Sequence, residues 1–369
     1  MRICYLSNSA IPSTLASSIQ IVKMCEAFSE LDNKVTLIST NVSLKKDNLF
    51  KFYNVKSRFD FKRIKYFKTF PLGIKYYLFS ICSILESFKY KPEVYITRNF
   101  FSCFLLLILK KKIIMELHHD LKIESRIVRF LVKNVKFLNS KHIIKIIAIT
   151  SGVKDEYTKN GLVKDHKTIV LPSGSSIKKN FSFSNKKNYF NIGYFGSLYK
   201  SRGFELIKKL AKIDNKNIYY LYGSSNNRNS LKVKNSSKNL HYKGHIPYRD
   251  IPKALSKMDI LLMPYVSSIT AAGDVGDNTK FTSPLKLFDY LSVGKIILCS
   301  NFDVLKEVIK DKKNTIFIKN YKNIFAWKNE IQKLSNQPEK QLIMSKNNYN
   351  LSKNYYLKER AKIILKLIK

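Results

Sequence analysis

The chain has 369 residues, of which 67 are Lys or Arg and 26 are Asp or Glu, so its formal net charge is +41. A length above the usual limit of about 250 to 300 residues for one hydrophobic core predicts two domains. Hydrophobic residues make up 45% and aromatic residues 13% of the chain, a composition that excludes a disordered basic tail.

The sequence predicts neither a membrane-spanning segment nor an export signal. Its longest apolar run, 100–109, is shorter than the ~20 residues that cross a bilayer. The N-terminus lacks the basic region, apolar core and cleavage site of a signal peptide, so we expect a cytoplasmic protein. The five cysteines stand in apolar segments without a close-spaced pair, which predicts buried thiols and neither a disulfide nor a metal site.

Short apolar runs alternate with amphipathic stretches along the N-terminal half. The pattern predicts a strand at 2–6, a helix at 18–31 and a second strand at 34–40. Further strand-like runs stand at 93–97, 112–117, 145–150 and 167–171. This alternation is typical of a parallel sheet with helices on both faces.

A polar stretch at 173–188 predicts a linker, and a second alternation of the same kind follows it. Its predicted strands are 191–195, 217–222, 240–243, 259–265, 295–300 and 315–319, and its predicted helices are 202–212, 248–257, 284–293 and one from 303. We therefore predict an α/β protein with two Rossmann-like doubly wound domains, 1–175 and 189–350, facing each other across a cleft. Ligands of such sheets bind beyond the carboxyl ends of the strands. A C-terminal helix within 351–369 is expected to pack back on the N-terminal domain.

Two N-terminal segments combine basic residues with apolar ones. Residues 45–68 hold nine Lys or Arg interleaved with aromatic residues, which makes the segment a candidate for a membrane-facing surface; the alternative is a nucleic-acid-binding segment. In 121–138 basic residues recur every three or four positions beside an apolar stripe. That spacing predicts one basic amphipathic helix suited to an anionic membrane surface, or alternatively a core-packed helix with a solvated outer face.

The segment 193–203 reads as a strand, a glycine turn with Gly196 and Ser197, and a helix start that carries Lys200 and Arg202. Backbone amides at a helix N-terminus together with two cations suit a diphosphate. The alternative is that the glycines serve the turn alone.

The segment 282–295 predicts a well-specified helix start, with Ser283 as N-cap and Pro284 as the first helical residue. Asp289 lies about one turn further and could accept hydrogen bonds from two neighbouring hydroxyls of a ribose. The alternative is an ordinary ion pair between Lys286 and Asp289 on a solvated helix.

Taken in order, the motifs resemble a family 4 glycosyltransferase with the GT-B fold, of the capsule and lipopolysaccharide type. The matching stretches are 20–28, 97–99, 115–120, 196–203, 259–265 and 283–291. The resemblance covers nearly the whole chain. It implies a retaining, metal-independent transfer of a sugar, without a cofactor, from a nucleotide-sugar donor to a glycan or lipid-linked glycan acceptor at the inner face of the cell membrane.

The resemblance also implies roles for individual residues. His118 would be the active-site histidine, and Lys200 and Arg202 would neutralise the leaving nucleoside diphosphate. The residues expected to contact the donor are Gly196, Ser197, Ser283, Leu285, Lys286 and Asp289. The further candidates, for acceptor or donor contacts, are His119, Arg98, Asp274 and Asp277.

The chain departs from the family pattern at the donor site. Phe281 stands where the family has the first glutamate of its Glu-x7-Glu motif, and Asp289 replaces the longer second glutamate. Asp274 or Asp277 is the candidate to substitute for the missing carboxylate. These departures predict an altered sugar preference or a weakened activity.

Two alternatives to sugar transfer follow from the same sequence. One is a basic nucleic-acid-binding protein, although the sequence lacks the usual nucleic-acid-binding signatures, and we expect no specific nucleic-acid partner. The other is a nucleotide-sugar epimerase on the same fold. The sequence predicts neither the base, the sugar, the acceptor nor the linkage.

Overall fold

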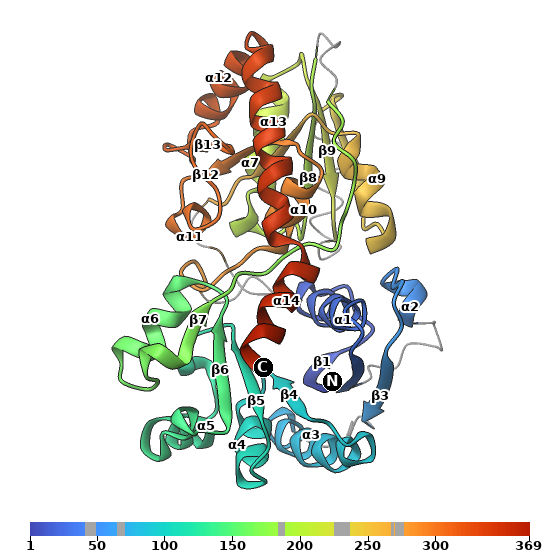
Figure 1. Cartoon of the computed structure of the whole chain (residues 1–369). Helices are drawn as coiled ribbons and strands as arrows, with labels where there is room; N and C mark the ends of the chain where they lie inside the picture. The colour runs from blue at the N-terminus through green and yellow to red at the C-terminus, as the bar shows by residue number, and fades with distance from the viewer. Residues whose placement is uncertain (41–48, 65–70, 184–188, 225–236, 267–268, 270–276) are drawn as a thin grey trace. The chain divides into compact units, whose positions relative to one another are not determined.

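The computed structural model describes residues 1–369 except 41–48, 65–70, 184–188, 225–236, 267–268 and 270–276 (Figure 1). The chain divides into two compact units. The first unit consists of Met1–Ser176 and Leu357–Lys369, and the second unit is Ile177–Tyr356. The returning C-terminal segment begins at Leu357, later than the expected 351, because helix α13 (Pro338–Ser352) continues within the second unit.

The first unit is built on a seven-stranded parallel sheet in the order β3-β2-β1-β4-β5-β6-β7. The strands are β1 Arg2–Ala10, β2 Lys34–Thr40, β3 Asp60–Ile64, β4 Val94–Thr97, β5 Ile113–Leu117, β6 Ile143–Ala148 and β7 Thr168–Val170. All but β3 correspond to predicted strands. β3 lies at the sheet edge and is mostly polar, so it carries no apolar run for the sequence pattern to detect.

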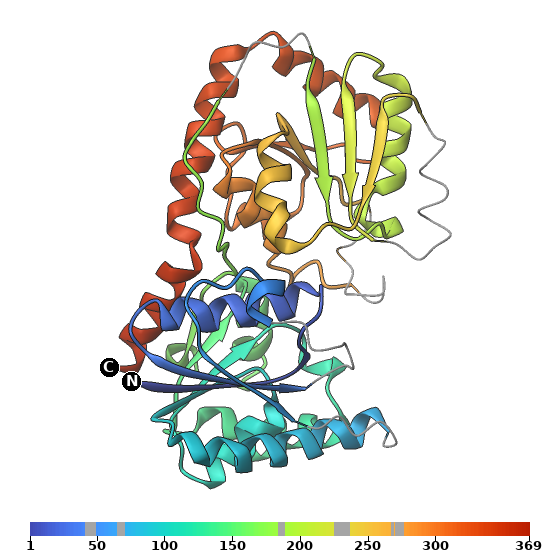
Figure 2. The ribbon, with the colours of Figure 1, turned by 90° about the vertical axis from the view of Figure 1, so that its right-hand side faces the viewer.

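Helices cover both faces of this sheet, as a doubly wound topology requires (Figure 2). On one face α1 packs against α14, and both contribute to one core cluster. On the other face α3 packs against α4. The helices of the unit are α1 Ala16–Ser29, α2 Leu49–Phe52, α3 Leu72–Ser87, α4 Phe100–Ile108, α5 Arg126–Phe130, α6 Ser151–Lys159 and α14 Leu357–Ile368.

The prediction of one amphipathic helix over 121–138 is wrong. The segment consists of a 3-10 turn at Leu121–Ile123, the short helix α5, a π turn at Leu131–Val135 and a 3-10 turn at Phe137–Asn139. Ser125 ends the first turn, because its side chain accepts a hydrogen bond from the Val128 amide and so starts a new helix. The backbone at Lys136 adopts the left-handed conformation and ends the π turn.

The basic aromatic segment 45–68 is described only from 49 to 64. Within that part, the Tyr53 ring is fully buried and Phe59 is 7% exposed. Phe50 packs edge-on against Phe59, with ring centroids 5.4 Å apart. These aromatic side chains fill the first unit's core and are therefore not displayed for stacking on nucleic-acid bases.

The second unit is built on a six-stranded parallel sheet in the order β10-β9-β8-β11-β12-β13. The strands, all at predicted positions, are β8 Asn191–Phe195, β9 Ile218–Tyr222, β10 Leu240–Gly244, β11 Ile260–Met263, β12 Ile296–Ser300 and β13 Thr315–Ile318. The helices are α7 Phe204–Ile213, α9 Ile251–Ser256, α10 Leu285–Ser292, α11 Asp303–Lys306, α12 Ile324–Ser335 and α13 Pro338–Ser352. Alternate strand residues enter two separate core clusters, one with α7 and α12 and the other with α9, α10 and α11.

The two parallel sheets confirm the predicted α/β class with two Rossmann-like units. Within the described parts of the chain, no helix is long and apolar enough to cross a membrane.

Candidate active site

In the second unit, a glycine turn follows β8 at the carboxyl end of the sheet. Gly196 has φ +150°, and its amide donates to the carbonyl of Tyr222 at the end of β9 (2.9 Å). A Cβ at Gly196 would stand 3.1 Å from the Tyr194 hydroxyl and 3.7 Å from the Lys286 Nζ. A glycine at this position therefore leaves space beside the lysine ammonium.

The turn continues into a 3-10 segment, Lys200–Arg202, and Gly203 then leads into α7. Gly203 has φ +78°, and a Cβ there would lie 1.7 Å from the Pro264 carbonyl oxygen, so only glycine allows this approach to the end of β11. Arg202 is half-buried beside Tyr265, and its Nη1 donates to the Tyr265 hydroxyl at 3.4 Å. Lys200, in contrast, is exposed.

Lys286 lies in the first turn of α10, with its ammonium between two tyrosine rings. The Nζ is 4.5 Å from the Tyr194 ring centroid and 4.8 Å from that of Tyr265. Burial, and then the nearby charge of Arg202, hold the pKa of Lys286 well below its usual range. Arg202, and not Asp289, is the charged group that acts on Lys286, and no ion pair between Lys286 and Asp289 is found among the described residues, so that alternative is wrong.

Lys286, Arg202, Tyr194 and Tyr265, together with Gly196, form what we call the cation site. The rings offer their electron-rich faces to both cations, yet no described carboxylate neutralises Lys286. Two cations held beside the same tyrosine ring suit an anion that carries more than one charge. The sequence pointed to Lys286 and Arg202 but not to the tyrosines, which are separated from them by up to 92 positions.

The other predicted donor-site residues surround α10 and the turn. Pro284, and not the predicted Ser283, occupies the N-cap position of the helix, which begins at Leu285. Asp289 is half-buried on the same helix. In the glycine turn, the carbonyl oxygen of Ser197 accepts a hydrogen bond from the Tyr194 hydroxyl at 2.8 Å.

The acidic candidates of the preceding loop are only partly described. Asp277 is exposed and accepts a hydrogen bond from the Thr279 amide (2.8 Å), whereas Asp274 lies outside the described residues. Phe281 is half-buried. No group of three or more His, Cys, Asp or Glu side chains within the described ranges could hold a metal ion.

In the first unit, the predicted His118 and Arg98 meet at one buried carboxylate. Glu116 on β5 is 1% exposed, and its Oε2 accepts from the Tyr5 hydroxyl (2.6 Å) and from Arg98 Nε (2.9 Å). The Nε2 of His118 lies 3.6 Å from the same oxygen. In the sequence, this site is marked by a glutamate inside the apolar run Ile-Ile-Met-Glu-Leu, which was not among the predicted site residues.

The charges around Glu116 set its protonation and that of His118. Burial alone would raise the pKa of Glu116, but Arg360 and Arg98 hold it well below its usual range. Burial, and then Arg98, lower the pKa of His118 to about 3. His118 is therefore a neutral imidazole near pH 7, suited to hydrogen bonding and not to proton donation as an imidazolium.

His119 has a different environment from His118. Its Nδ1 lies 3.1 Å from the Asp120 carbonyl oxygen, and its Nε2 lies 3.4 Å from Glu124 Oε1. Burial raises the pKa of Glu124. The two neighbouring histidines therefore lie beside different carboxylates. His118 lies beside Glu116, which also binds Arg98, whereas His119 lies beside Glu124.

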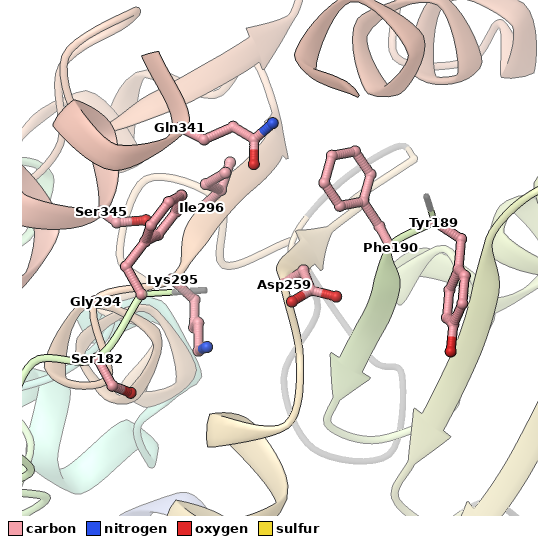
Figure 3. Close-up of a pocket in the computed structure, with 10 residues that line it drawn as sticks. Ser182, Tyr189, Phe190, Asp259, Gly294, Lys295, Ile296, Gln341 and Ser345 are labelled. Carbon is pink, nitrogen blue, oxygen red and sulfur yellow. The ribbon is translucent and has the colours of Figure 1, made fainter. Parts of the chain in front are cut away.

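A separate hollow in the second unit lies at the opposite end of its sheet (Figure 3). Its lining includes Phe190, Asp259 and Lys295, which directly precede β8, β11 and β12. Asp259 accepts a hydrogen bond from the Asn191 amide (2.7 Å) and so ties β8 to β11. Because ligands of parallel sheets bind at the carboxyl ends, this hollow is not the candidate active site.

The two doubly wound parallel sheets place the protein in the α/β class with Rossmann-like units. Residues 176–351, nearly all of the second unit, match the family model described as glycosyl transferases group 1. The second unit therefore belongs to the group 1 glycosyltransferase family. This confirms the family resemblance of the sequence. No curated protein matches the chain.

Several solved structures share the fold at low identity. HepE of Anabaena, in complex with UDP and glucose, is 14% identical, with a TM-score of 0.69 and 99% of each chain covered. The lipopolysaccharide outer core galactosyltransferase WaaB is 13% identical, with a TM-score of 0.64 over 100% of this chain and 99% of that one. A protein described as a UDP-N-acetylglucosamine 2-epimerase, from Listeria monocytogenes, is 12% identical, with a TM-score of 0.64 over 100% and 95%. At such identities the likeness shows the fold alone.

Proposed function

We propose that the protein transfers a sugar from a nucleotide-sugar donor to a glycan or lipid-linked glycan acceptor, and that the cation site binds the donor diphosphate. The observation that carries this proposal is the Lys286 ammonium, held between two tyrosine rings beside Arg202 without a described acidic partner. Loss of the sugar leaves a diphosphate with more negative charge than the donor had. Two fixed cations stabilise that charge as it develops.

Support for a nucleotide donor also comes from the comparisons. Structures of HepE with similar architecture contain UDP, UDP with glucose, or UDP-glucose. We infer a uridine nucleotide as the first donor to test. Asp289 remains our candidate for the ribose hydroxyls, because it follows Lys286 by about one turn of α10.

The test of this function is release of nucleoside diphosphate from nucleotide sugars, measured with and without extracted lipid-linked glycans. We expect release to depend on the acceptor. A nucleotide-sugar epimerase, the alternative on the same fold, would instead convert the donor without any acceptor. Conversion that is indifferent to acceptor would overturn the transferase proposal.

We further propose that the protein works at the inner face of the cell membrane through exposed apolar residues of the first unit. On α3 and the turn after it, Ile74, Ile81, Leu85 and Phe88 are 40 to 60% exposed and are spaced seven, four and three residues apart. That spacing places them on one side of the helix. The sequence pattern predicted this role for 121–138 and 45–68 and did not point to α3.

The segment that contains α5 adds to this surface. The Tyr77 hydroxyl on α3 lies 2.6 Å from Ser125 Oγ, and the Tyr77 ring packs against Phe101 of α4 at 4.7 Å. The large apolar side chains exposed along α3, α4 and the α5 segment, which we call the α3–α5 face, are Ile74, Ile81, Leu85, Phe88, Ile108, Leu109, Ile123, Ile127, Phe130 and Val135.

The charges of the same elements suit anionic lipid. The cations are Lys75, Lys89, Lys110, Lys111, Lys122, Arg126, Arg129, Lys133 and Lys136. Lys111 Nζ lies 5.7 Å from the Phe88 ring centroid, so a cation and an exposed ring adjoin there. Peripheral proteins bind anionic membranes by inserting apolar side chains into the lipid while nearby Lys and Arg side chains attract the anionic headgroups.

We expect the protein to sediment with vesicles that contain anionic phospholipid, and the double variant Ile81→Ser, Leu85→Ser to bind them at least about tenfold more weakly. Each such side chain contributes roughly 1.5–3 kcal/mol when fully buried in an apolar phase. Ile343→Ser is the matched control, because Ile343 is 58% exposed on α13 of the second unit. Equal losses in both variants, or no binding by the unaltered protein, would refute the assignment.

A further inference from the structure

The Glu116 carboxylate joins the candidate histidine to the C-terminal helix. One oxygen, Oε2, faces Tyr5, Arg98 and His118, as described above. The other, Oε1, lies 2.8 Å from Nη2 of Arg360 on α14. Arg360 follows Glu116 by 244 positions, so no local sequence pattern indicates this contact.

Arg360 is held firmly at this place. It is 3% exposed, and its Nε donates to the Pro172 carbonyl oxygen at 3.0 Å. The neighbouring α14 residues Leu357, Ala361 and Ile364 are buried in the same core cluster as α1 and β1. The guanidinium therefore approaches Glu116 from a packed helix and not from a mobile chain end.

We propose that Arg360 is a positioning residue for His118: it holds the Glu116 carboxylate in place, and Glu116 in turn fixes the imidazole with its Nε2 turned toward the carboxylate. The importance of this role for catalysis depends on the proposed transferase function. A buried carboxylate that orients a histidine determines which ring nitrogen carries the proton.

The charged and titratable groups around the Glu116 carboxylate, beside which this imidazole lies, come from five elements. They are Tyr5 on β1, Cys25 on α1, Arg98 after β4, Glu116 on β5 and Arg360 on α14. Both guanidinium groups oppose a proton on His118, whereas Glu116 favours one. Loss of Arg360 removes one opposing charge and leaves Glu116 paired with Arg98, so the pKa of His118 must rise.

The test follows the His118 ring nitrogens by NMR in the full chain, with the signal assigned by its loss in His118→Gln. In the unaltered protein the His118 pKa of about 3 predicts that the chemical shift of this signal does not change between about pH 5 and 8. In Arg360→Gln we expect the signal to begin to move at a higher pH than in the unaltered protein, with both titrations followed from pH 8 down to the lowest pH at which the proteins stay folded. Arg360→Lys keeps a cation at this place, so its His118 chemical shift should depend on pH as it does in the unaltered protein.

Lys366→Gln is the matched control, since it removes one exposed positive charge from the same helix. The proposal is overturned if His118 titrates alike in Arg360→Gln and the unaltered protein, or if Lys366→Gln has the same effect as Arg360→Gln. If Arg360→Gln does not fold, Arg360→Met takes its place, and the two outcomes are judged in the same way.

These measurements need no substrate, so they succeed or fail separately from the transferase proposal. Where transfer has been measured, Arg360→Gln is expected to lower kcat while the KM for the donor stays unchanged, because the donor diphosphate is assigned to the cation site of the other unit. Arg360→Lys should recover most of the rate.

Discussion

Replacing Lys286 by methionine is expected to weaken the binding of nucleoside diphosphate at least tenfold, and with it the rate of transfer. The variant keeps the stem that packs between Tyr194 and Tyr265 but removes the ammonium. Truncating a desolvated charge that faces an anion costs about 2 kcal/mol or more. Binding is measured by calorimetric titration, and Lys253→Met, at an exposed lysine of α9, is the control.

The pH dependence of this binding follows from the lowered pKa of Lys286 in the free protein. A diphosphate beside the ammonium raises that pKa, so binding takes up a proton wherever the free lysine is deprotonated. The affinity of the unaltered protein should therefore fall as the pH rises through that range. Lys286→Met should lack this component, while the ionisation of the nucleotide affects both proteins equally. An identical pH dependence in the two proteins would contradict the assignment.

The second large effect is expected at Glu116. Glu116→Ala leaves Arg98 and Arg360 buried without their shared carboxylate, and breaking such a pair costs about 3–5 kcal/mol. Trp327, the single tryptophan, is buried in the second unit, so its fluorescence follows that unit separately. In urea we expect the circular dichroism transition of the first unit to shift much more than the fluorescence transition.

Glu359→Ala is the control for this prediction, because Glu359 pairs with Lys362 at the surface of α14 (2.8 Å) and such pairs contribute at most about 1 kcal/mol. The folded pKa of Glu116 is depressed, so its contribution to stability is complete above the ordinary glutamate pKa. It is lost as the pH falls toward the folded pKa. Equal destabilisation by the two substitutions would show that the buried carboxylate has no special role.

The fold could be predicted from the sequence because buried parallel strands read as continuous apolar runs. β11 and β12, for example, are entirely buried and apolar apart from Cys299 and Ser300. The edge strand β3 has no such run and was missed. The broken segment 121–138 was taken for one helix, because its 3.6-residue spacing persists across the breaks at Ser125 and Lys136.

The candidate site could be predicted only where a local motif marks it. Arg202 and Lys286 stand in motifs that the sequence shows, although their roles stay predictions. The tyrosine rings around Lys286 and the Arg360–Glu116 pair depend on contacts between distant parts of the chain. A single sequence contains no distance between such parts, so these partners emerge only from the folded units.

The central claim is that the cation site of the second unit binds the diphosphate of a nucleotide-sugar donor. The most direct measurement is a thermal-shift panel of UDP, GDP, ADP and CMP, with their common sugars, on the unaltered protein and Lys286→Met. A ligand that binds only the folded state raises the midpoint of unfolding. We predict a rise with one nucleotide class in the unaltered protein and little or none in Lys286→Met. No rise with any of them in the folded protein, or an equal rise in the variant, would contradict the claim.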